Sequence, residues 1–165
     1  MYSPLKITID TREQRPWSFP EHSTVATRGT IKVGDYSLTG DEDLFSVERK
    51  SLDDFVGSIS TTWDQFRVRF VKMKEANWPA MVCIVESDFV DTCFKDVSDK
   101  IEPPPHNHPR ITPQFIRARI AELSYYGAGI LFAGTPDLAS ALCWRVLYER
   151  QCDLDGMSNE IERIK

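Results

Sequence analysis

The stretch of sequence that decides the fold lies at 34–54 and reads GDYSLTGDEDLFSVERKSLDD. Its period-2 pattern predicts a strand over 44–50, on which Glu48 and Lys50 share one face while the arginine between them points to the other. Asp35 belongs to the Gly-Asp pair that precedes this strand. Two carboxylates can hold a divalent ion against a phosphodiester, and a lysine beside them can stabilise the developing negative charge. The stretch therefore predicts a metal-dependent phosphodiesterase site.

The same residues have a simpler interpretation, a surface hairpin whose charges form an ion pair. Glu-Arg-Lys alone is a common tripeptide and would favour that alternative. Its combination with the Gly-Asp pair, with Asp54 and with the segment around Asp10 favours the site. Asp35 and Glu48 are then the predicted ligands of Mg²⁺ or Mn²⁺, because these hard ions prefer carboxylate oxygen. The backbone carbonyl of Arg49 is a further predicted ligand.

Strand patterns outside this stretch predict a sheet. Residues 5–10 alternate apolar and polar side chains and end on a carboxylate. Residues 24–33 are rich in β-branched side chains and lead into 35–39, so these segments and 44–50 are predicted to form two or three antiparallel strands. The apolar run at 81–85 is typical of a central strand covered on both faces.

Capping residues mark the predicted helices. Ser51 can cap a helix that begins at Leu52, and Thr-Pro pairs predict the start of two later helices. The proline-rich segment 96–111 is predicted to be a surface loop without regular structure, and its His-Asn-His triplet is too compact for the nuclease motif of that name. The predicted helices span 62–77, 113–126 and 136–150, with a strand at 129–133 between the last two.

The composition fits one soluble intracellular domain. The chain has 165 residues and a net charge of −5, so a general attraction to phosphate is absent and any grip on nucleic acid must come from local basic groups and bound metal. The four cysteines form no Cys-x-x-Cys pair, which predicts buried free thiols. No signal peptide or long apolar run is present in the sequence, which predicts no membrane partner and a cytoplasmic location.

Three ordered blocks of the sequence resemble the nuclease domain of the XPF endonuclease family, a branch of the restriction-endonuclease-like fold. The blocks are DTRE at 10–13, VGDY at 33–36 and VERKSLDD at 47–54. The resemblance implies an α/β fold with a central mixed sheet flanked by helices on both sides. It extends over a predicted nuclease domain at 1–150, followed by a polar C-terminal tail at 151–165. Eukaryotic members continue into a helix-hairpin-helix module, which this sequence lacks, so a stand-alone nuclease of phage or prophage type, or one subunit of a larger assembly, is expected.

The resemblance also implies roles for individual residues. The implied catalytic residues are Asp35, Glu48, Lys50 and Arg49. Asp10 is either an additional metal ligand or a strand-end capping residue. Asp54 either supports the site or stabilises a helix start, where an acid is favourable without any catalysis. The other residues implied to support the site or to contact phosphate are Arg12 and Glu13.

The function implied by the resemblance is a metal-dependent DNA endonuclease that acts on branched or flapped duplexes. A general or restriction-type duplex nuclease is one alternative, and a non-catalytic scaffold subunit that binds DNA and partners is another. Arg67 and Arg69 are the favoured contacts to the phosphate backbone, although a solvated helix face is the default for such charges. Trp17 is a candidate for stacking on a base, whereas Trp63, Trp78 and Trp144 are expected in the core or an interface.

The apolar pattern of the predicted helix 136–150 bears on the oligomeric state. The helix carries two apolar rows, which are Leu138, Leu142 and Val146 in one and Ala141, Trp144 and Tyr148 in the other. One row can pack on the sheet and the other on a second subunit, which favours a homodimer. The resemblance agrees with this pairing and also allows a heteromeric partner. The alternative is a helix wedged between the sheet and helix 113–126, with both rows buried in one chain.

Overall fold

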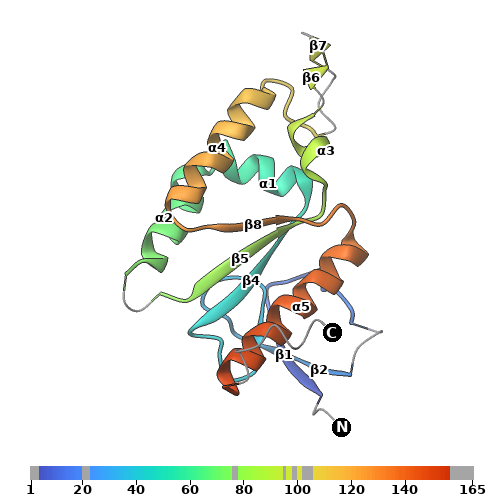
Figure 1. The fold of residues 1–165 in the computed structure, drawn as a ribbon, viewed down its shortest axis with the longest axis vertical. Coiled ribbons are helices and arrows are strands. Elements are labelled where there is room, and N and C mark those ends of the chain that lie inside the picture. Colours follow the sequence, from blue (N-terminus) through green and yellow to red (C-terminus); the bar gives the residue numbers. More distant parts are fainter. Residues whose placement is uncertain are drawn as a thin grey trace.

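The computed structural model describes residues 4–19, 23–75, 78–94, 96–97, 100–101 and 106–156. Six strands form one sheet in the order β2-β1-β3-β4-β5-β8 (Figure 1). These strands are β1 Leu5–Asp10, β2 Thr24–Gly29, β3 Tyr36–Leu38, β4 Phe45–Lys50, β5 Ala80–Val85 and β8 Gly129–Phe132. The helices are α1 Leu52–Ile59, α2 Trp63–Met73, α3 Phe89–Cys93, α4 Pro113–Tyr125 and α5 Pro136–Leu154. The α/β class is therefore as predicted.

The sheet is mixed, as expected, but the N-terminal pairing differs from the prediction. Strand β3 pairs antiparallel with both β1 and β4, whereas β2 lies parallel to β1 at the edge. The predicted strand 24–33 ends at Gly29, because the chain then bends and the backbone N–H of Ile31 donates to the Asp10 carboxylate at 2.7 Å. The predicted antiparallel pairing of 35–39 with 44–50 is confirmed, but 24–33 does not join it, because alternation alone does not give the partner or the direction of a strand.

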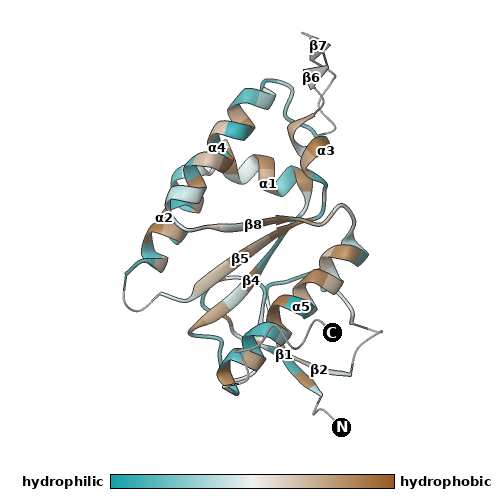
Figure 2. Cartoon of the chain, in the orientation of Figure 1, coloured by the Kyte–Doolittle hydropathy of each residue, from teal (hydrophilic) through white to brown (hydrophobic). Residues whose placement is uncertain are grey.

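Helices cover both faces of the sheet. Helices α1, α2 and α4 pack with one hydrophobic cluster, and α5 packs with the other (Figure 1). Strand β5 serves both clusters, because Cys83 and Val85 belong to the first and Ile84 to the second. It lies between β4 and β8, and its brown colour in Figure 2 shows the apolar run that predicted an interior strand. That prediction is confirmed.

Three predicted helix starts are confirmed at the level of single hydrogen bonds. The Ser51 hydroxyl accepts from the backbone N–H of Asp54, at the start of α1. Thr112 and Thr135 cap α4 and α5 in the same way, each with proline in the first turn. Each cap satisfies a backbone donor that the helix itself leaves unpaired. Ser51 also fixes where β4 ends and α1 begins, directly after the Glu-Arg-Lys segment.

Helix α5 packs on the sheet through a row that the sequence analysis did not choose. Its fully buried row is Ala139, Cys143 and Leu147, and both predicted rows flank it. Leu142, Val146, Trp144 and Tyr148 are partly buried against the same cluster, whereas Leu138 is exposed. The wide apolar stripe is thus used mostly within one chain, on the face opposite α4. The helix also runs past its predicted end at 150, and Cys152 is buried.

The segment after β5 holds more regular structure than predicted. Strands β6 Asp96–Val97 and β7 Lys100–Ile101 form an antiparallel pair, so the prediction of an irregular loop over 96–111 was wrong for its first part. The triple proline falls outside the described residues. All four cysteines are free and buried, as predicted. Among the described residues, no helix combines the length and the apolar character needed to cross a membrane.

Candidate active site

The candidate site forms where β1, β3 and β4 meet. The backbone N–H of Asp35 donates to the Val47 carbonyl at 2.8 Å, and that of Asp10 donates to the Asp35 carbonyl at 2.8 Å. Gly34 makes this junction feasible, because its φ is +90° and a Cβ atom there would lie 2.6 Å from the Ser46 hydroxyl. The Gly-Asp pair is therefore needed for the close approach of the two strands. It brings the carboxylate of Asp35 beside β4.

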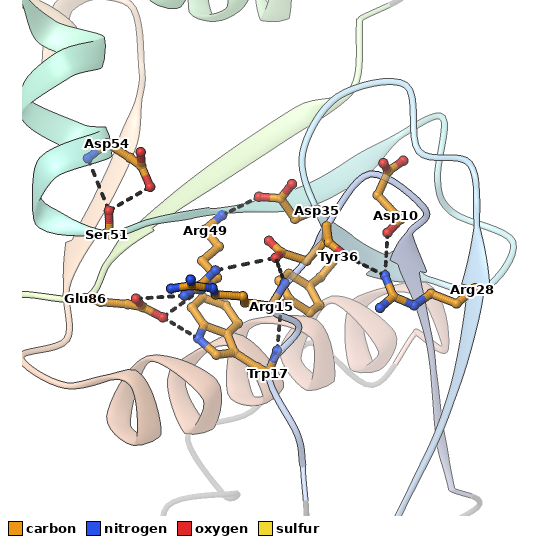
Figure 3. Close-up of polar contacts among 11 residues, drawn as sticks. Asp10, Arg15, Trp17, Arg28, Asp35, Tyr36, Arg49, Ser51, Asp54 and Glu86 are labelled. Carbon is orange, nitrogen blue, oxygen red and sulfur yellow. Dashed lines mark hydrogen bonds and ion pairs between the residues drawn. The ribbon is translucent and has the colours of Figure 1, made fainter.

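Asp35 is held in place by a backbone donor and lies close to a like charge. One of its oxygens accepts a hydrogen bond from the backbone N–H of Arg49 at 2.8 Å (Figure 3). Burial and the nearby charge of Glu48 raise the pKa of Asp35 to about 7. Two carboxylates that share a partly dry site disfavour double ionisation, and a bound cation removes that conflict. Asp35 therefore has the electrostatic setting of a metal ligand.

Glu48 and Lys50 share a face, as the period of the strand predicted. The Lys50 ammonium lies 2.9 Å from Oε1 of Glu48, and the Arg69 guanidinium of α2 donates to the same oxygen at 3.0 Å. Burial lowers the pKa of Lys50, but the charge and the hydrogen bond of Glu48 outweigh it and leave this pKa raised. Lys50 is therefore a fixed positive charge at neutral pH.

This donor set fits a small, hard divalent ion. Asp35 and Glu48 supply carboxylate oxygens, which Mg²⁺ and Mn²⁺ prefer, and Mg²⁺ keeps several waters when one or two carboxylates bind it. Across the part of the chain that the structure describes, no three His, Cys, Asp or Glu side chains converge as a larger ligand set. The two carboxylates are thus the acidic part of the site, and other ligands would be waters, phosphate oxygens or the Arg49 carbonyl.

Asp10 lies next to this site but its carboxylate is already in use. Oδ1 accepts from the backbone and the guanidinium of Arg12 at 2.8 and 2.6 Å, and Oδ2 accepts from the backbone of Ile31. Burial alone would raise the pKa of Asp10, but these hydrogen bonds lower it. The arrangement suits the strand-end alternative. Asp10 anchors Arg12, whose side chain is 68% exposed and lines the cleft described below.

The opposite face of β4 holds a closed polar cluster. Arg49 forms two hydrogen bonds with Glu86, at 2.7 and 3.1 Å (Figure 3). It also forms an ion pair with Glu13 at 3.4 Å. The Trp17 indole N–H donates to the same Glu86 at 2.7 Å, and its ring stacks on Tyr36 at 4.9 Å. Trp17 is buried, so its ring is part of this cluster and not a free stacking surface.

The sequence analysis missed Glu86. It follows β5 directly, and its backbone N–H donates to the Lys50 carbonyl at 2.8 Å. An acid at the end of a buried strand was the available signal, because parallel neighbours bring their carboxyl ends together. The link to Arg49 could only be seen once β4 and β5 were known to pair in parallel.

Asp54 lies apart from the carboxylates. Its backbone N–H donates to the Ser51 hydroxyl, and that hydroxyl donates to the Asp54 carboxylate at 2.7 Å (Figure 3). This is the helix-start alternative that the sequence analysis left open. The structure shows no contact between Asp54 and Asp35 or Glu48 among its hydrogen bonds and ion pairs in the described residues.

A cleft of about 430 Å³ opens over Asp35 and Glu48. Its lining includes four basic and two acidic side chains, so its charge is net positive, in contrast to the net negative charge of the chain. The lining residues are Arg12, Lys32, Val33, Gly34, Asp35, Glu48, Gln65, Val68, Arg69, Lys72 and Trp78. Arg69 thus faces the site, whereas Arg67 contacts Tyr126 and Asp64 and does not line the cleft.

A fold with a mixed sheet, a Gly-Asp junction and a Glu-Arg-Lys strand beside a basic cleft defines the class of XPF-like nuclease domains. Comparison with family models gives the same assignment, because the ERCC4 domain matches residues 9–143. The chain therefore belongs to the ERCC4-domain family. No curated protein sequence matches the chain.

Solved structures support the assignment of the fold. XPF from Aeropyrum pernix in complex with DNA is similar with a TM-score of 0.63 and 18% identity, over 96% of this chain and 69% of that chain. A second structure of XPF from the same organism is similar with a TM-score of 0.62 and 19% identity, over 87% of this chain and 60% of that chain. The chain therefore spans about six to seven tenths of the length of these two structures. At such identities the likeness shows the fold, which is the restriction-endonuclease-like fold of the XPF nuclease domain.

Proposed function

We propose that this protein is a Mg²⁺- or Mn²⁺-dependent DNA endonuclease that hydrolyses phosphodiester bonds. The observation that carries the proposal is that Asp35 and Glu48 line one cleft and that the Lys50 ammonium lies 2.9 Å from the Glu48 carboxylate. The raised pKa of Asp35 supports it, since paired carboxylates in a cleft are a common sign of a functional site. Membership of the ERCC4-domain family supports nuclease activity independently of this geometry.

The residues of the chain divide the work of hydrolysis. Asp35 and Glu48 would hold the metal ion, which when bound supplies Lewis-acid stabilisation and a more acidic water. The backbone N–H of Arg49 orients Asp35, and Lys50 offers a fixed ammonium to negative charge that develops on the phosphate. Arg12 and Arg69 line the same cleft and would contact the phosphates of the DNA backbone. The expected products are a 5′-phosphate and a 3′-hydroxyl.

The proposed substrate is a branched or flapped DNA duplex. The basic lining of the cleft provides the local attraction to phosphate that an acidic chain otherwise lacks. Preference for a branch, as opposed to any duplex, comes from the family resemblance and is the finer part of the proposal. A general duplex nuclease would cut linear and branched DNA equally, and a scaffold subunit would bind both and cut neither.

The deciding experiment compares labelled linear, flap, fork and four-way-junction DNAs with Mg²⁺, Mn²⁺ or EDTA. We expect cleavage of the branched substrates with either metal and none in EDTA. Equal cleavage of all four DNAs would replace the branch preference with general duplex cleavage. DNA binding without cleavage under every condition would contradict the nuclease and favour the scaffold.

The homodimer or heteromeric pairing also remains a proposal. Most of the apolar stripe of α5 is engaged within the chain, so an interface would have to use its exposed end at Leu138 together with the partly exposed Trp144 and Tyr148. We expect light scattering at tens of micromolar to give a dimer mass, and Trp144→Glu to give a monomer with unchanged circular dichroism. A monomer mass for the wild type would remove the homodimer.

A further inference from the structure

The cleft contains one aromatic side chain whose surroundings the catalytic proposal does not explain. Trp78 lies just before β5, and two lysines from separate segments reach its ring. The Lys32 ammonium lies 4.8 Å and the Lys72 ammonium 5.0 Å from the ring centroid. Both distances are within the range of a cation–π contact. Lys32 precedes Asp35 by three positions and Lys72 belongs to α2, so this group joins two walls of the cleft.

The contacts of Trp78 differ from those of two other tryptophans. The indole N–H of Trp17 donates to Glu86, and that of Trp144 donates to Thr24 at 3.0 Å. The Trp78 indole N–H makes no hydrogen bond within the described residues, and its ring is only partly buried. Packing at the edge of a core cluster and the two lysines are thus what holds this ring. Such a ring can present a face to a ligand without losing a hydrogen bond.

An aromatic ring between basic side chains is the combination that binds unpaired nucleotides. A base can stack on the ring whatever its sequence, while the flanking cations contact the phosphates on either side. Bases inside a duplex are already stacked and cannot reach such a ring, so the ligand must contain an unpaired segment. Lys32 and Lys72 are exposed and can transfer their ammonium groups from the ring to phosphate oxygen.

We propose that Lys32, Trp78 and Lys72 form a subsite for an unpaired nucleotide of a DNA substrate. The subsite lies in the same cleft as Asp35 and Glu48, so it would hold a single-stranded arm next to the phosphodiester that is cut. The inference rests on the proposed function and extends it, because it names the part of the chain that distinguishes a flap or fork from a linear duplex. The preference is set by Trp78 and the overall grip by the lysines.

The test measures DNA binding in EDTA, where cleavage is not required. Fluorescence anisotropy compares a duplex that carries a single-stranded arm with a blunt duplex of the same length. We expect Trp78→Ala to weaken binding of the armed DNA at least about fivefold, as for the loss of one base–aromatic stack, and to leave the blunt duplex unchanged. Trp78→Phe should keep most of the binding. Lys32→Ala and Lys72→Ala should each weaken both DNAs and reduce the salt dependence of binding.

The chain offers a matched control in Tyr126. Its ring also lies near two cations, Arg67 at 6.0 Å and Lys74 at 5.8 Å, but none of these three residues lines the cleft. Tyr126→Ala and Lys74→Ala should therefore leave the ratio of the two affinities unchanged. An equal loss in Tyr126→Ala, or an unchanged ratio in Trp78→Ala, would overturn the subsite.

A second measurement keeps the inference testable if Trp78→Ala does not fold. With wild type and Trp78→Phe, 2-aminopurine placed in the arm should be quenched on binding at one or two positions, whereas 2-aminopurine in the duplex part should not. Absence of position-dependent quenching would overturn the subsite. The cleavage experiment tests the proposed function separately. If the wild type prefers armed DNA but cuts no DNA in Mg²⁺ or Mn²⁺, the subsite is supported and the nuclease activity is contradicted.

Discussion

The two faces of β4 carry charged residues that alternate along the strand, yet they differ in how those charges are balanced. On one face Glu48 lines a cleft and pairs with Lys50, and the neighbouring Asp35 has a raised pKa because of burial and a like charge. On the other face Arg49 is matched by Glu86 and Glu13 in a closed cluster. The closed face has its charges satisfied by the protein itself, whereas the open face has an electrostatic conflict that a ligand can relieve.

The largest expected effect comes from removing a carboxylate on the open face. Asp35→Ala should reduce cleavage at least about a thousandfold, because the charge stabilisation from a bound metal ion is worth several kcal/mol. Thermal stability should hold or rise, since the substitution removes the like-charge conflict with Glu48. Steady-state cleavage and a melting curve in EDTA check both parts. Asp43→Ala, an exposed acid in the same hairpin, is the matched control and should cut normally.

The next effect separates Lys50 from the metal ligands. Lys50→Ala should lower turnover by about 10²–10³-fold, as for loss of a transition-state charge contact, while Mn²⁺ binding persists. Turnover and calorimetric titration with Mn²⁺ measure the two quantities on one sample. Turnover of Lys50→Ala at the wild-type level would show that catalysis needs no fixed cation at this position. Loss of Mn²⁺ binding would instead show that Lys50 helps to form the metal site.

The pH dependence of folding sharpens the comparison further. The pKa of Asp35 is about 7 in the folded chain and about 3.9 when unfolded, so between pH 4 and 7 the folded state holds a proton that the unfolded state has released. Stability without metal should therefore fall as pH rises through this window, by about 2–4 kcal/mol. Urea melts in EDTA can measure it. Asp35→Asn should flatten the slope, and an unchanged slope would contradict the assignment to Asp35.

The smallest effect on catalysis, and the largest on the closed face, is expected for Glu86→Gln. It leaves the partly buried Arg49 without its main charge partner, which should cost about 3 kcal/mol of folding stability. The melting temperature should then fall by about 6–12 °C. Cleavage below that temperature should change far less than in Asp35→Ala. If the Glu86→Gln protein has normal stability and does not cleave DNA, Glu86 acts in catalysis and not in the stability of the closed face.

The sequence predicted what depends on local periods and missed what depends on strand direction. The shared face of Glu48 and Lys50 follows from the period of a strand, and the Ser51 cap follows from residue type. Glu86 was missed because it reaches Arg49 only through the parallel pairing of β4 with β5. That pairing joins residues far apart in sequence, and no local pattern encodes it.

Helix geometry explains two further results. Arg67 and Arg69 stand two positions apart on α2, about 200° around the helix, so only one of them can face the cleft. Arg69 contacts Glu48 and Arg67 contacts Tyr126, a choice that needed the position of the sheet. For α5 the apolar residues surround so much of the helix that the buried row, through Cys143, could not be chosen from composition.

The tight junction at Gly34 bears on the accuracy of folding. A slip of one residue between β3 and β4 would exchange the two faces of β4, so that Arg49 entered the cleft and Glu48 and Lys50 met the cluster around Glu86. The hydrogen bond from the Asp35 backbone N–H to the Val47 carbonyl fixes the native register. In a shifted register, a residue with a side chain would take the place of Gly34 opposite Ser46, where there is no room for a Cβ atom. Gly34 thus helps to select the native register of β3 and β4, and it disfavours misfolded states in which every strand forms but the wrong charges face the cleft.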